Sequence, residues 1–399
     1  MKQKRNHDPN DTDFLHKRKN ILTSRILVGI VGIYSDIRIA WIFTSFLRWF
    51  ILGIALLYSV FSLLLQAYSI NTGRYFRLFK ASAKLSGLYV AFLIYHLTGI
   101  FAADIFWLLT KHWITSLLWH PFLSALALAE GIIVSEYGRR HALRIKTTEY
   151  RVRIPKWKDK ESYRIVQLSD LHIGSIIGED YIRKTVRQVN QLKPDLAVIT
   201  GDIFNQTTAD EIPDYDAVFS ILSEIEAPDG LYVIRGNHDP EIDSIRWQDF
   251  LCASGAEDLD NRCLVTDKLN LVGRGGLAKD PYRTPLRTLL SGQDPTKPTV
   301  VLDHDPAGIP EAEKENADLI LCGHTHDGQF FPCNYFIRYW YGKAWSHGLC
   351  RNGNTISIVS SGTGFFQTPV RVGTDSEIAV IGLTGTGKKD SRRKLLFSA

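Results

Sequence analysis

Long apolar runs crowd into the first third of this 399-residue chain, and nearly all of them fall before about residue 138. A helix needs about 20 mostly apolar residues to cross a hydrocarbon core. Four segments approach this length, at about residues 26–47, 49–68, 85–109 and 113–134. The first of them carries Asp36 and Arg38, which are costly in lipid unless they pair or snorkel. The sequence therefore predicts a helical transmembrane domain of about four spans over residues 21–138.

Three clusters of basic residues flank these apolar segments. One lies in a basic tail over residues 1–20, one falls between the second and third segments at 74–84, and one follows the last at 139–146. Short loops rich in Lys and Arg stay on the cytoplasmic side. Four spans put all three clusters on that side, whereas three spans would oppose the first cluster to the second. The charge placement therefore predicts a multi-pass protein of the cell membrane whose carboxyl-terminal domain is cytoplasmic.

Cysteine usage and net charge add weaker constraints. The five cysteines are odd in number and include no CxxC pair, which argues against a disulfide framework and mildly favours a reducing compartment. The net charge of +5 is modest, and we expect no nucleic-acid partner.

Beyond the apolar third, the composition changes character. Residues 139–160 are basic and polar, and we interpret them as a linker along the membrane surface. Residues 161–385 alternate short apolar runs with amphipathic helical patterns, which is typical of an α/β domain. A basic tail follows over residues 386–399. Five of the short runs read as buried strands, at 163–168, 196–200, 231–234, 299–302 and 319–322.

Each of these five runs is followed at once by polar residues that can bind metals. The motifs are Asp170-Leu171-His172, Gly201-Asp202, Gly236-Asn237-His238-Asp239, Asp303-His304-Asp305 and Gly323-His324-Thr325-His326. Loops at the carboxyl ends of strands are where α/β sheets assemble sites. Carboxylate, amide and imidazole donors together suit divalent Mn, Fe, Zn or Co. Two such ions, about 3.5–4 Å apart, can hold both the attacking and the leaving oxygen of a displacement at phosphorus.

The ordered motifs resemble the signature of the calcineurin-like metallophosphoesterase superfamily, which runs D-x-H, G-D, G-N-H-D/E, H and G-H-x-H. The resemblance covers about residues 161–385. The residues at 323–329, 361–364 and 369–371 are similar to the bacterial membrane-associated branch, and the wider superfamily includes enzymes that hydrolyse the pyrophosphate of UDP-diacylglucosamine. The resemblance implies an α/β metallophosphoesterase fold, with two mixed β-sheets flanked by helices, behind the transmembrane domain.

The resemblance also implies a role for each motif residue. Asp170, His172 and His326 would bind one divalent ion, Asn237, His304 and His324 would bind the other, and Asp202 would bridge the two. His238 would face the leaving oxygen, with Asp239 holding its imidazole. Asp303 and Asp305, which flank His304, are interpreted as loop groups. Asp327 departs from many relatives of this branch, which carry Gly there, and it adds a negative charge at the rim.

Two features leave alternatives open. Arg235, Arg274 and Arg371 are candidates to hold the substrate phosphate, but each could instead form a structural ion pair. The aromatic stretch from Phe330 to Trp345, interleaved with basic residues, fits either core packing or the lipid interface.

These observations predict a membrane-anchored hydrolase that cleaves a phosphodiester or pyrophosphate bond by metal-activated hydroxide. Its expected partners are the lipid bilayer and a phosphate-containing substrate, and attachment to the bilayer favours a substrate that is lipid-linked or interfacial. The alternatives are a phosphodiesterase that acts on soluble phosphodiesters and a non-catalytic membrane sensor that keeps the fold.

Reporter fusions after Ala399 test the predicted topology. With four spans, a reporter that fluoresces only in the cytoplasm should light up, and an alkaline phosphatase fusion should stay inactive, because the three basic clusters hold their loops on the cytoplasmic side. The opposite pair of results would reject this topology and leave the metal assignments untouched.

Overall fold

The structure is a computed structural model, and it describes residues 34–35, 76–111, 113, 119–159, 162–205, 215–276 and 283–385. The chain divides into two compact units, Met1–Glu136 and Tyr137–Ala399. This division places all four predicted transmembrane segments in the first unit and all of the metal-binding motifs in the second.

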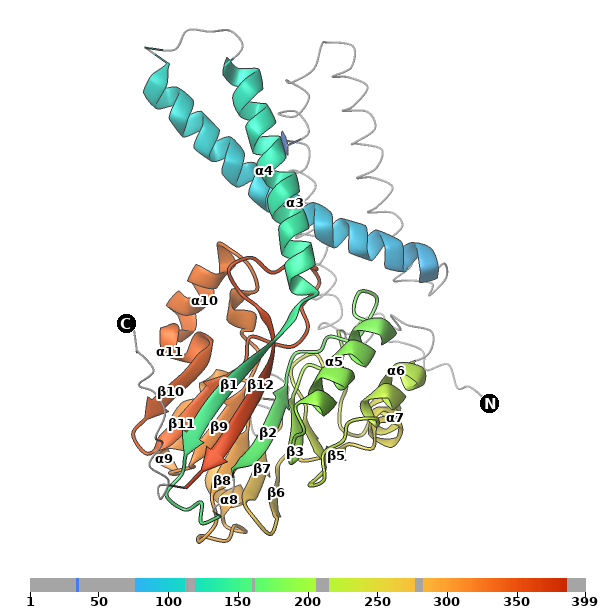
Figure 1. The fold of residues 1–399 in the computed structure, drawn as a ribbon, viewed down its shortest axis with the longest axis vertical. Coiled ribbons are helices and arrows are strands. Elements are labelled where there is room, and N and C mark those ends of the chain that lie inside the picture. The colour runs from blue at the N-terminus through green and yellow to red at the C-terminus, as the bar shows by residue number, and fades with distance from the viewer. Residues whose placement is uncertain are drawn as a thin grey trace, which may run out of the picture. The chain divides into compact units, whose positions relative to one another are not determined.

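Two long helices make up most of the described part of the first unit (Figure 1). They are α3 (Phe76–Thr110) and α4 (Trp119–Ala142). The last turns of α4 belong to the second unit. Within α3, the segment Gly87–Thr110 is long and apolar enough to cross a membrane, judged by length and composition alone. It coincides with the predicted span at 85–109, and it is the one segment among the described residues that meets this test.

The other predicted spans are less well covered by the structure. The segment at 113–134 overlaps α4 in part. The segments at 26–47 and 49–68 lie outside the described residues, apart from residues 34–35. The number of spans therefore stays a prediction.

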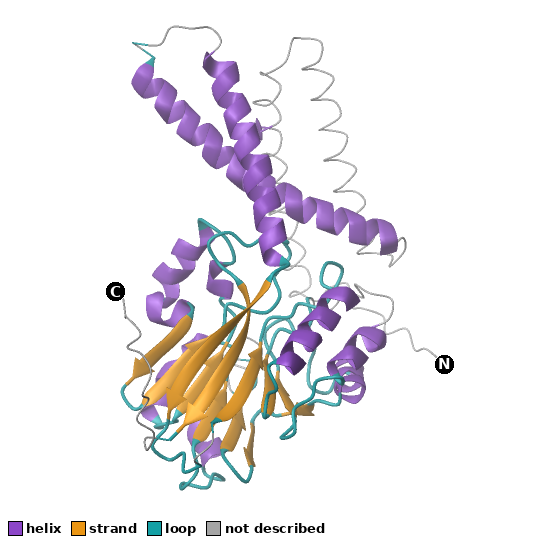
Figure 2. Ribbon diagram, viewed as in Figure 1, coloured by secondary structure: helices purple, strands orange, loops and turns teal. Residues whose placement is uncertain are grey.

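Two six-stranded sheets form the body of the second unit (Figure 2). The first sheet has the order β1 (Ile145–Arg153), β12 (Ser376–Thr384), β2 (Tyr163–Leu168), β3 (Leu196–Thr200), β4 (Leu231–Ile234) and β5 (Glu257–Asp258). The second has the order β10 (Gly348–Asn352), β11 (Thr355–Val359), β9 (Leu319–Cys322), β8 (Thr299–Leu302), β7 (Asn270–Gly273) and β6 (Arg262–Val265). All five predicted strands are present with the predicted bounds, as β2, β3, β4, β8 and β9.

Strand pairing brings the motif-bearing strand ends together. In the first sheet, β2, β3 and β4 pair in parallel, and in the second β8 and β9 do the same. Each sheet also contains antiparallel pairs, such as β12 with β2 and β10 with β11, so both are mixed. Because parallel neighbours end at the same edge, the loops that follow them lie side by side. This arrangement confirms the predicted fold class.

The two sheets pack face to face around one hydrophobic core. Ile165 and Val198 of the first sheet lie in the same buried cluster as Leu271, Val300 and Leu321 of the second. Side chains point alternately to the two faces of a strand, so the other face of each sheet needs its own cover. A second buried cluster joins Val301 and Ile320 to helices on the outer face of the second sheet.

Helices flank the sandwich on both sides. The remaining elements are α5 (Glu179–Gln191), α6 (Tyr215–Leu222), α7 (Ile245–Ser254), α8 (Leu286–Leu290), η1 (Pro306–Gly308), α9 (Ile309–Lys314), η2 (His326–Gly328), α10 (Cys333–Tyr341) and α11 (Lys343–Ser346). In α5, Ile182, Val186 and Val189 are buried at the three- and four-residue spacing of one helical face. It matches the amphipathic helical pattern that the sequence predicts within residues 161–385.

The structure differs from the predicted linker over residues 139–160. The last turn of α4 continues to Ala142, and residues 145–153 form the edge strand β1, which pairs in parallel with β12. Only the ends of β1 carry buried side chains, at Ile145 and Val152, so the strand lacks the apolar run of a central strand. An edge strand has one hydrogen-bonded neighbour and tolerates such polar composition.

Candidate metal centre

The structure brings the first set of predicted metal ligands together at the end of β2. Asp170 and His172 follow β2, and His326 lies in the loop after β9. The His172 and His326 Nε2 atoms are 3.0 Å apart, and His326 Nε2 lies 3.3 Å from Asp170 Oδ1. All three residues are buried, and one ligand atom from each lies within 4.8 Å of the others.

The second set gathers beside it at the ends of β4, β8 and β9. The side-chain oxygen of Asn237 lies 2.9 Å from His324 Nδ1 and 3.1 Å from His304 Nε2. His304 Nδ1 lies 2.7 Å from the backbone carbonyl of Thr200 and donates a hydrogen bond to it. That hydrogen bond fixes the tautomer, because it leaves the lone pair of His304 on Nε2, the atom that faces the cluster.

Asp202 lies between the two sets. Its Oδ2 is 3.3 Å from His304 Nε2 and 3.8 Å from His172 Nε2, so one carboxylate oxygen faces a ligand of each set. Its other oxygen accepts a hydrogen bond of 2.8 Å from the backbone N–H of His238. Asp202 therefore holds the position that a bridging ligand needs.

The donor spacing fits divalent ions. Nitrogen and oxygen ligands bind zinc at about 2.0–2.2 Å, so two ligands on one ion lie roughly 3.0–3.5 Å apart. Most of the distances within each set fall in that range, and the atoms that converge are carboxylate oxygens, an amide oxygen and imidazole nitrogens. This donor set suits Mn, Fe, Zn or Co.

Five of the candidate ligands have left-handed backbone conformations. Asp170, His172, Asp202, His324 and His326 have φ values between 46° and 71°. Such a conformation costs about 1–3 kcal/mol for a residue with a side chain, although Asp and His accept it more readily than most. Strain of this kind clusters at functional sites, where the surrounding fold holds it.

Glycines permit the close approach of the motif loops. A Cβ on Gly236 would collide with the Asp202 carboxylate, and a Cβ on Gly323 would collide with Ser169 and Asp170. The Gly residues of the G-N-H-D and G-H-x-H motifs are thus required by the space beside the ligands.

Burial and neighbouring charges together set the protonation states of the cluster. Burial raises the pKa of Asp170 and Asp202, but the neighbouring histidines outweigh it and hold both carboxyls below their usual pKa range. Burial lowers the pKa of His172 to about 3, which leaves a neutral imidazole. Burial also lowers the pKa of His304, but Asp202 outweighs it and raises that pKa to about 10. The cluster therefore favours positive charge, in the form of a proton or of a metal ion that replaces it.

His238 lies at the mouth of this cluster and is not one of the converging ligands. Its ring packs against Phe366, with centroids 4.6 Å apart, and edge-on against His172 at 5.2 Å. Burial lowers the pKa of the His238 imidazole. Phe366 also packs on His172 at 5.0 Å, so it braces two motif histidines at once.

Asp239 holds backbone amides of the motif loops. One carboxylate oxygen accepts hydrogen bonds from the N–H groups of Ile203 and Phe204, and the other accepts one from Gly236. Burial, with the nearby Asp202 carboxylate, raises the pKa of Asp239 to about 7. The resemblance implies that Asp239 orients His238, and the contacts show that it also ties the loop after β3 to the loop after β4.

The three candidate phosphate-binding arginines are buried and bound to protein groups. Arg235 pairs with Asp260 and Glu241, and Arg274 pairs with Glu311 at 2.7 Å. Arg371 is fully buried and donates hydrogen bonds to the carbonyls of His326, Ser361, Gly362 and Gly364. These contacts favour a structural role for each arginine over binding of the substrate phosphate.

Acidic residues near the motifs are also engaged. Asp303 accepts two hydrogen bonds of 2.8 Å from Arg283, and Asp305 accepts the N–H of Ala307 at the start of η1, as expected for loop groups. Asp327 is buried and binds Arg338 of α10 through both carboxylate oxygens, at 2.7 and 3.1 Å. Its charge is therefore neutralised by Arg338.

Sequence reasoning missed Phe366, Arg283 and the Asp327–Arg338 pair. Phe366 lies in an irregular segment where no periodicity marks it, although it follows Gly364 closely. Arg283 stands 20 residues before its partner Asp303, and no local pattern links the two.

The sequence profile of the family described as calcineurin-like phosphoesterase matches residues 163–328. An uncharacterized metallophosphoesterase of Helicobacter pylori is 30% identical over 230 residues, covering 56% of this chain and 60% of that protein. A Danio rerio protein named "Transmembrane protein with metallophosphoesterase domain" is 29% identical over 276 residues, covering 65% and 62%. Bacillus subtilis YkuE, an uncharacterized metallophosphoesterase, is 28% identical over 278 residues, covering 65% and 94%.

The matched segment contains the two motif-bearing sets of strands, so the second unit is built around a metallophosphoesterase domain. Residues 163–328 are thus similar to the calcineurin-like phosphoesterase family, and the relatives that match this chain are named as metallophosphoesterases or as carrying a metallophosphoesterase domain. The chain spans 60% of the length of the Helicobacter relative. A solved structure titled as that of an archaeal phosphodiesterase aligns with a TM-score of 0.27 and 14% identity over 49% of this chain and 82% of that chain.

Asp202→Ala should remove activity together with much of the bound metal, because its Oδ2 faces ligands of both sets. Metal analysis of the purified protein measures this directly. Asp249→Ala, which removes an exposed carboxylate of α7, serves as the matched control and should keep the parental metal content. An Asp202→Ala protein with unchanged metal and normal turnover would refute the assignment.

Arg371→Met should destabilise the second unit, because it leaves several buried carbonyls without donors. Each unsatisfied buried group costs about 1–3 kcal/mol, so the thermal midpoint of the full-length protein should fall by several degrees. A residue that only holds substrate phosphate would instead raise KM and leave the midpoint unchanged. That second pattern would return Arg371 to the substrate site.

Proposed function

We propose that this protein is a membrane-anchored phosphohydrolase that uses two divalent ions to cleave a phosphodiester or pyrophosphate bond. The observation that carries the proposal is the position of Asp202, whose Oδ2 lies between His304 of one donor set and His172 of the other. A carboxylate shared in this way offsets the mutual repulsion of two cations, which a single-ion site does not require.

Each donor set would hold one ion. Asp170, His172 and His326 would bind the first, Asn237, His304 and His324 the second, and Asp202 both. Mn, Fe, Zn and Co all suit this mixture of donors. When bound, such ions supply a water of lowered pKa as the nucleophile and stabilise charge on the phosphoryl oxygens.

The protein groups around the ions would orient the reactants. The backbone N–H of His238 holds the second oxygen of Asp202, which fixes the carboxylate between the two donor sets. The His238 ring, braced by Phe366, would face the leaving oxygen and donate a proton to it. Asp239 would keep His238 in place through the loop amides that it binds.

Membrane attachment favours a lipid-linked or interfacial substrate. Support comes from the apolar segment Gly87–Thr110 and from the Danio rerio relative, whose name describes a transmembrane protein. We extend the proposal to a multi-pass protein with its catalytic domain in the cytoplasm, on the basis of the basic clusters in the sequence.

Hydrolysis of bis(p-nitrophenyl) phosphate by the purified full-length protein with Mn²⁺ tests the proposed activity. Turnover that chelation removes and Mn²⁺ restores supports it. Protein that retains two ions per chain and turns over neither this diester nor lipid pyrophosphates would instead be the non-catalytic sensor.

His238→Ala should keep both ions and lower turnover by roughly 10²–10⁴, the usual contribution of a general acid. The loss should shrink for acidic leaving groups, which depart without a proton. Asp239→Asn should show a milder loss, because its amide nitrogen can no longer accept the N–H of Gly236. An equal loss for good and poor leaving groups would remove His238 from the proton-donor role.

A further inference from the structure

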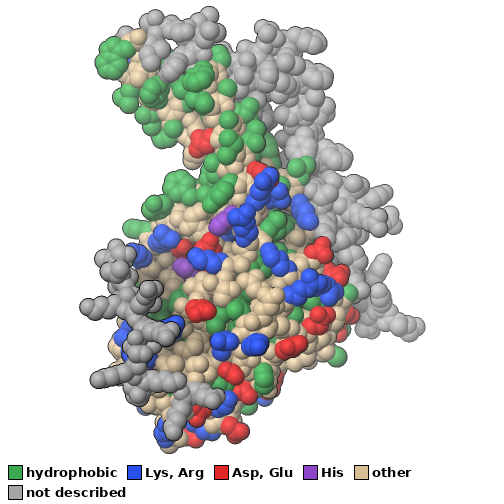
Figure 3. Space-filling view, in the orientation of Figure 1, with side chains coloured by type: hydrophobic (Ala, Val, Ile, Leu, Met, Phe, Trp, Pro, Cys, Tyr) green, Lys and Arg blue, Asp and Glu red, His purple; other side chains and the backbone are tan. Residues whose placement is uncertain are grey.

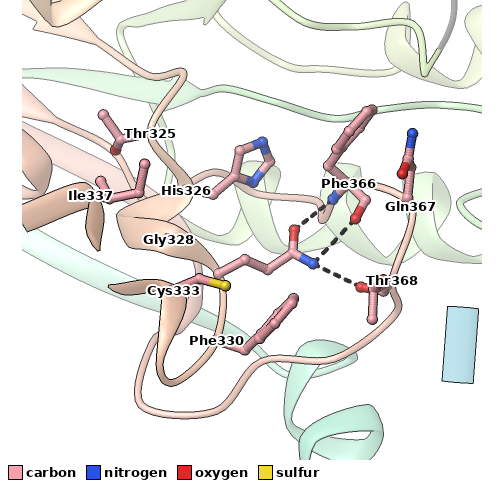
Figure 4. Close-up of a pocket in the computed structure, with 10 residues that line it drawn as sticks. Thr325, His326, Gly328, Phe330, Cys333, Ile337, Phe366, Gln367 and Thr368 are labelled. Atoms are coloured by element: carbon pink, nitrogen blue, oxygen red, sulfur yellow. Dashed lines mark hydrogen bonds between the residues drawn. The ribbon is translucent and has the colours of Figure 1, made fainter. Parts of the chain in front are cut away.

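A cavity of about 320 Å³ adjoins the candidate metal centre. Its wall includes His326, a proposed metal ligand, and Phe366, which packs on His172 and His238. Figure 4 shows these two residues on one side of the cavity and Phe330 and Cys333 on the other. The cavity therefore shares His326 with the candidate metal centre, is open to solvent, and has the volume of a small-molecule site, for which about 300–1,000 Å³ is usual.

The cavity offers few free polar groups to a ligand. Among the residues that the structure describes, no lysine, arginine, aspartate or glutamate lines it. The Gln329 side chain is already occupied, because its amide nitrogen donates to the carbonyls of Phe366 and Thr368 and its oxygen accepts the N–H of Phe366 (Figure 4). A phosphate or a sugar would lose hydrogen bonds to water on entering such a space, whereas hydrocarbon would not.

Helix α10 presents two different faces. Cys333 and Ile337, one turn apart, line the cavity. The outer face exposes large side chains that are between 63% and 89% accessible, and hydrophobic groups gather over this region in the space-filling view (Figure 3). These outer residues are Tyr335, Phe336, Tyr339 and Trp340. Amphipathic aromatics on one helical face are typical of elements that lie in a lipid interface.

Two contacts hold α10 in register with the metal-binding loop and with the point where the chain enters the domain. Arg338 binds Asp327, which directly follows His326. The N–H of Phe331 donates to the carbonyl of Val372, and the N–H of the adjacent Arg371 donates to Gly138 in the last turns of α4. These contacts tie α10 to the loop that carries His326 and tie the segment just before α10 to residues 371–372, which contact the last turns of α4.

We infer that this cavity is a subsite for the hydrocarbon part of an amphiphilic phosphoester, which α10 receives from a lipid surface. The inference rests on the proposed function, since the phosphoryl group would lie at the ions beside His326 while the chain lies against Ile337 and Phe330. It names the substrate class as one with an apolar group within a few bonds of the phosphorus.

A series of alkylphosphonates tests the subsite without depending on which bond is cleaved. Methyl-, ethyl-, propyl- and butylphosphonate are titrated into the Mn²⁺-loaded full-length protein by calorimetry and used as inhibitors of bis(p-nitrophenyl) phosphate hydrolysis. Burial of each methylene should tighten binding by about fourfold until the cavity is full. A change of less than about 1.5-fold per methylene would overturn the inference, even where the diester is hydrolysed.

Variants on the two faces of α10 separate the cavity from the lipid surface. Ile337→Trp should fill the cavity and flatten the chain-length dependence while methylphosphonate still binds, and Cys333→Phe is the second variant if Ile337→Trp lowers the thermal midpoint. Trp340→Ser, on the outer face, should keep the dependence for soluble phosphonates and weaken inhibition by hexadecylphosphonate held in phosphatidylcholine vesicles.

These measurements test the hydrocarbon subsite and the proposed hydrolytic function separately. Loss of the slope in Ile337→Trp, with retention in Trp340→Ser, supports the subsite. An equal slope in all three proteins would place the chain elsewhere and overturn it. Hexadecylphosphonate inhibition unchanged by Trp340→Ser would overturn delivery from the lipid surface. Absence of hydrolysis of both the diester and lipid pyrophosphates in the parent would defeat the proposed function, while the calorimetric slope would still report on the cavity.

Discussion

The Asp202 carboxylate is the interaction on which the rest of the site depends. One of its oxygens faces His304 and His172, and the other accepts the N–H of His238. This position can exist only because β2 and β3 end together in one sheet and β8 and β9 end together in the other, with the sheets packed face to face. The glycines that precede Asn237 and His324 leave room for the carboxylates, and the left-handed backbone at the ligands turns their side chains inward.

Around this centre, buried charges hold the loops. Asp239 takes three backbone amides, Arg371 gives hydrogen bonds to several carbonyls, and Arg283 grips Asp303 beside His304. Several hydrogen bonds offset the desolvation cost of each of these buried groups and hold the loops in place. Farther from the centre, the ion pair between Asp327 and Arg338 fixes α10 against the loop that carries His326.

The sequence pattern predicted the central strands and the metal-binding motifs that follow them. Central strands such as β3 are buried throughout, so an apolar run marks them, and the metal motifs follow those runs directly. Strand β1 is an edge strand with mostly polar side chains, so it has no apolar run to mark it. The sequence pattern therefore predicts a linker at these residues instead of a strand. The contacts of Phe366 and of the buried arginines could not be predicted from local pattern, because their partners are distant in sequence. Arg371, for example, binds the carbonyls of His326 and Ser361 only after the loops have folded. The roles of the motif residues, and the number of spans, remain predictions.

Electron paramagnetic resonance of the manganese-loaded protein tests the central claim most directly. Two ions that share the Asp202 carboxylate should lie about 3.5–4 Å apart, as in other two-metal sites. At that separation the spectrum at saturation should show exchange-coupled Mn²⁺ with two ions per chain. A spectrum of isolated Mn²⁺ with one ion per chain at saturation would contradict the account.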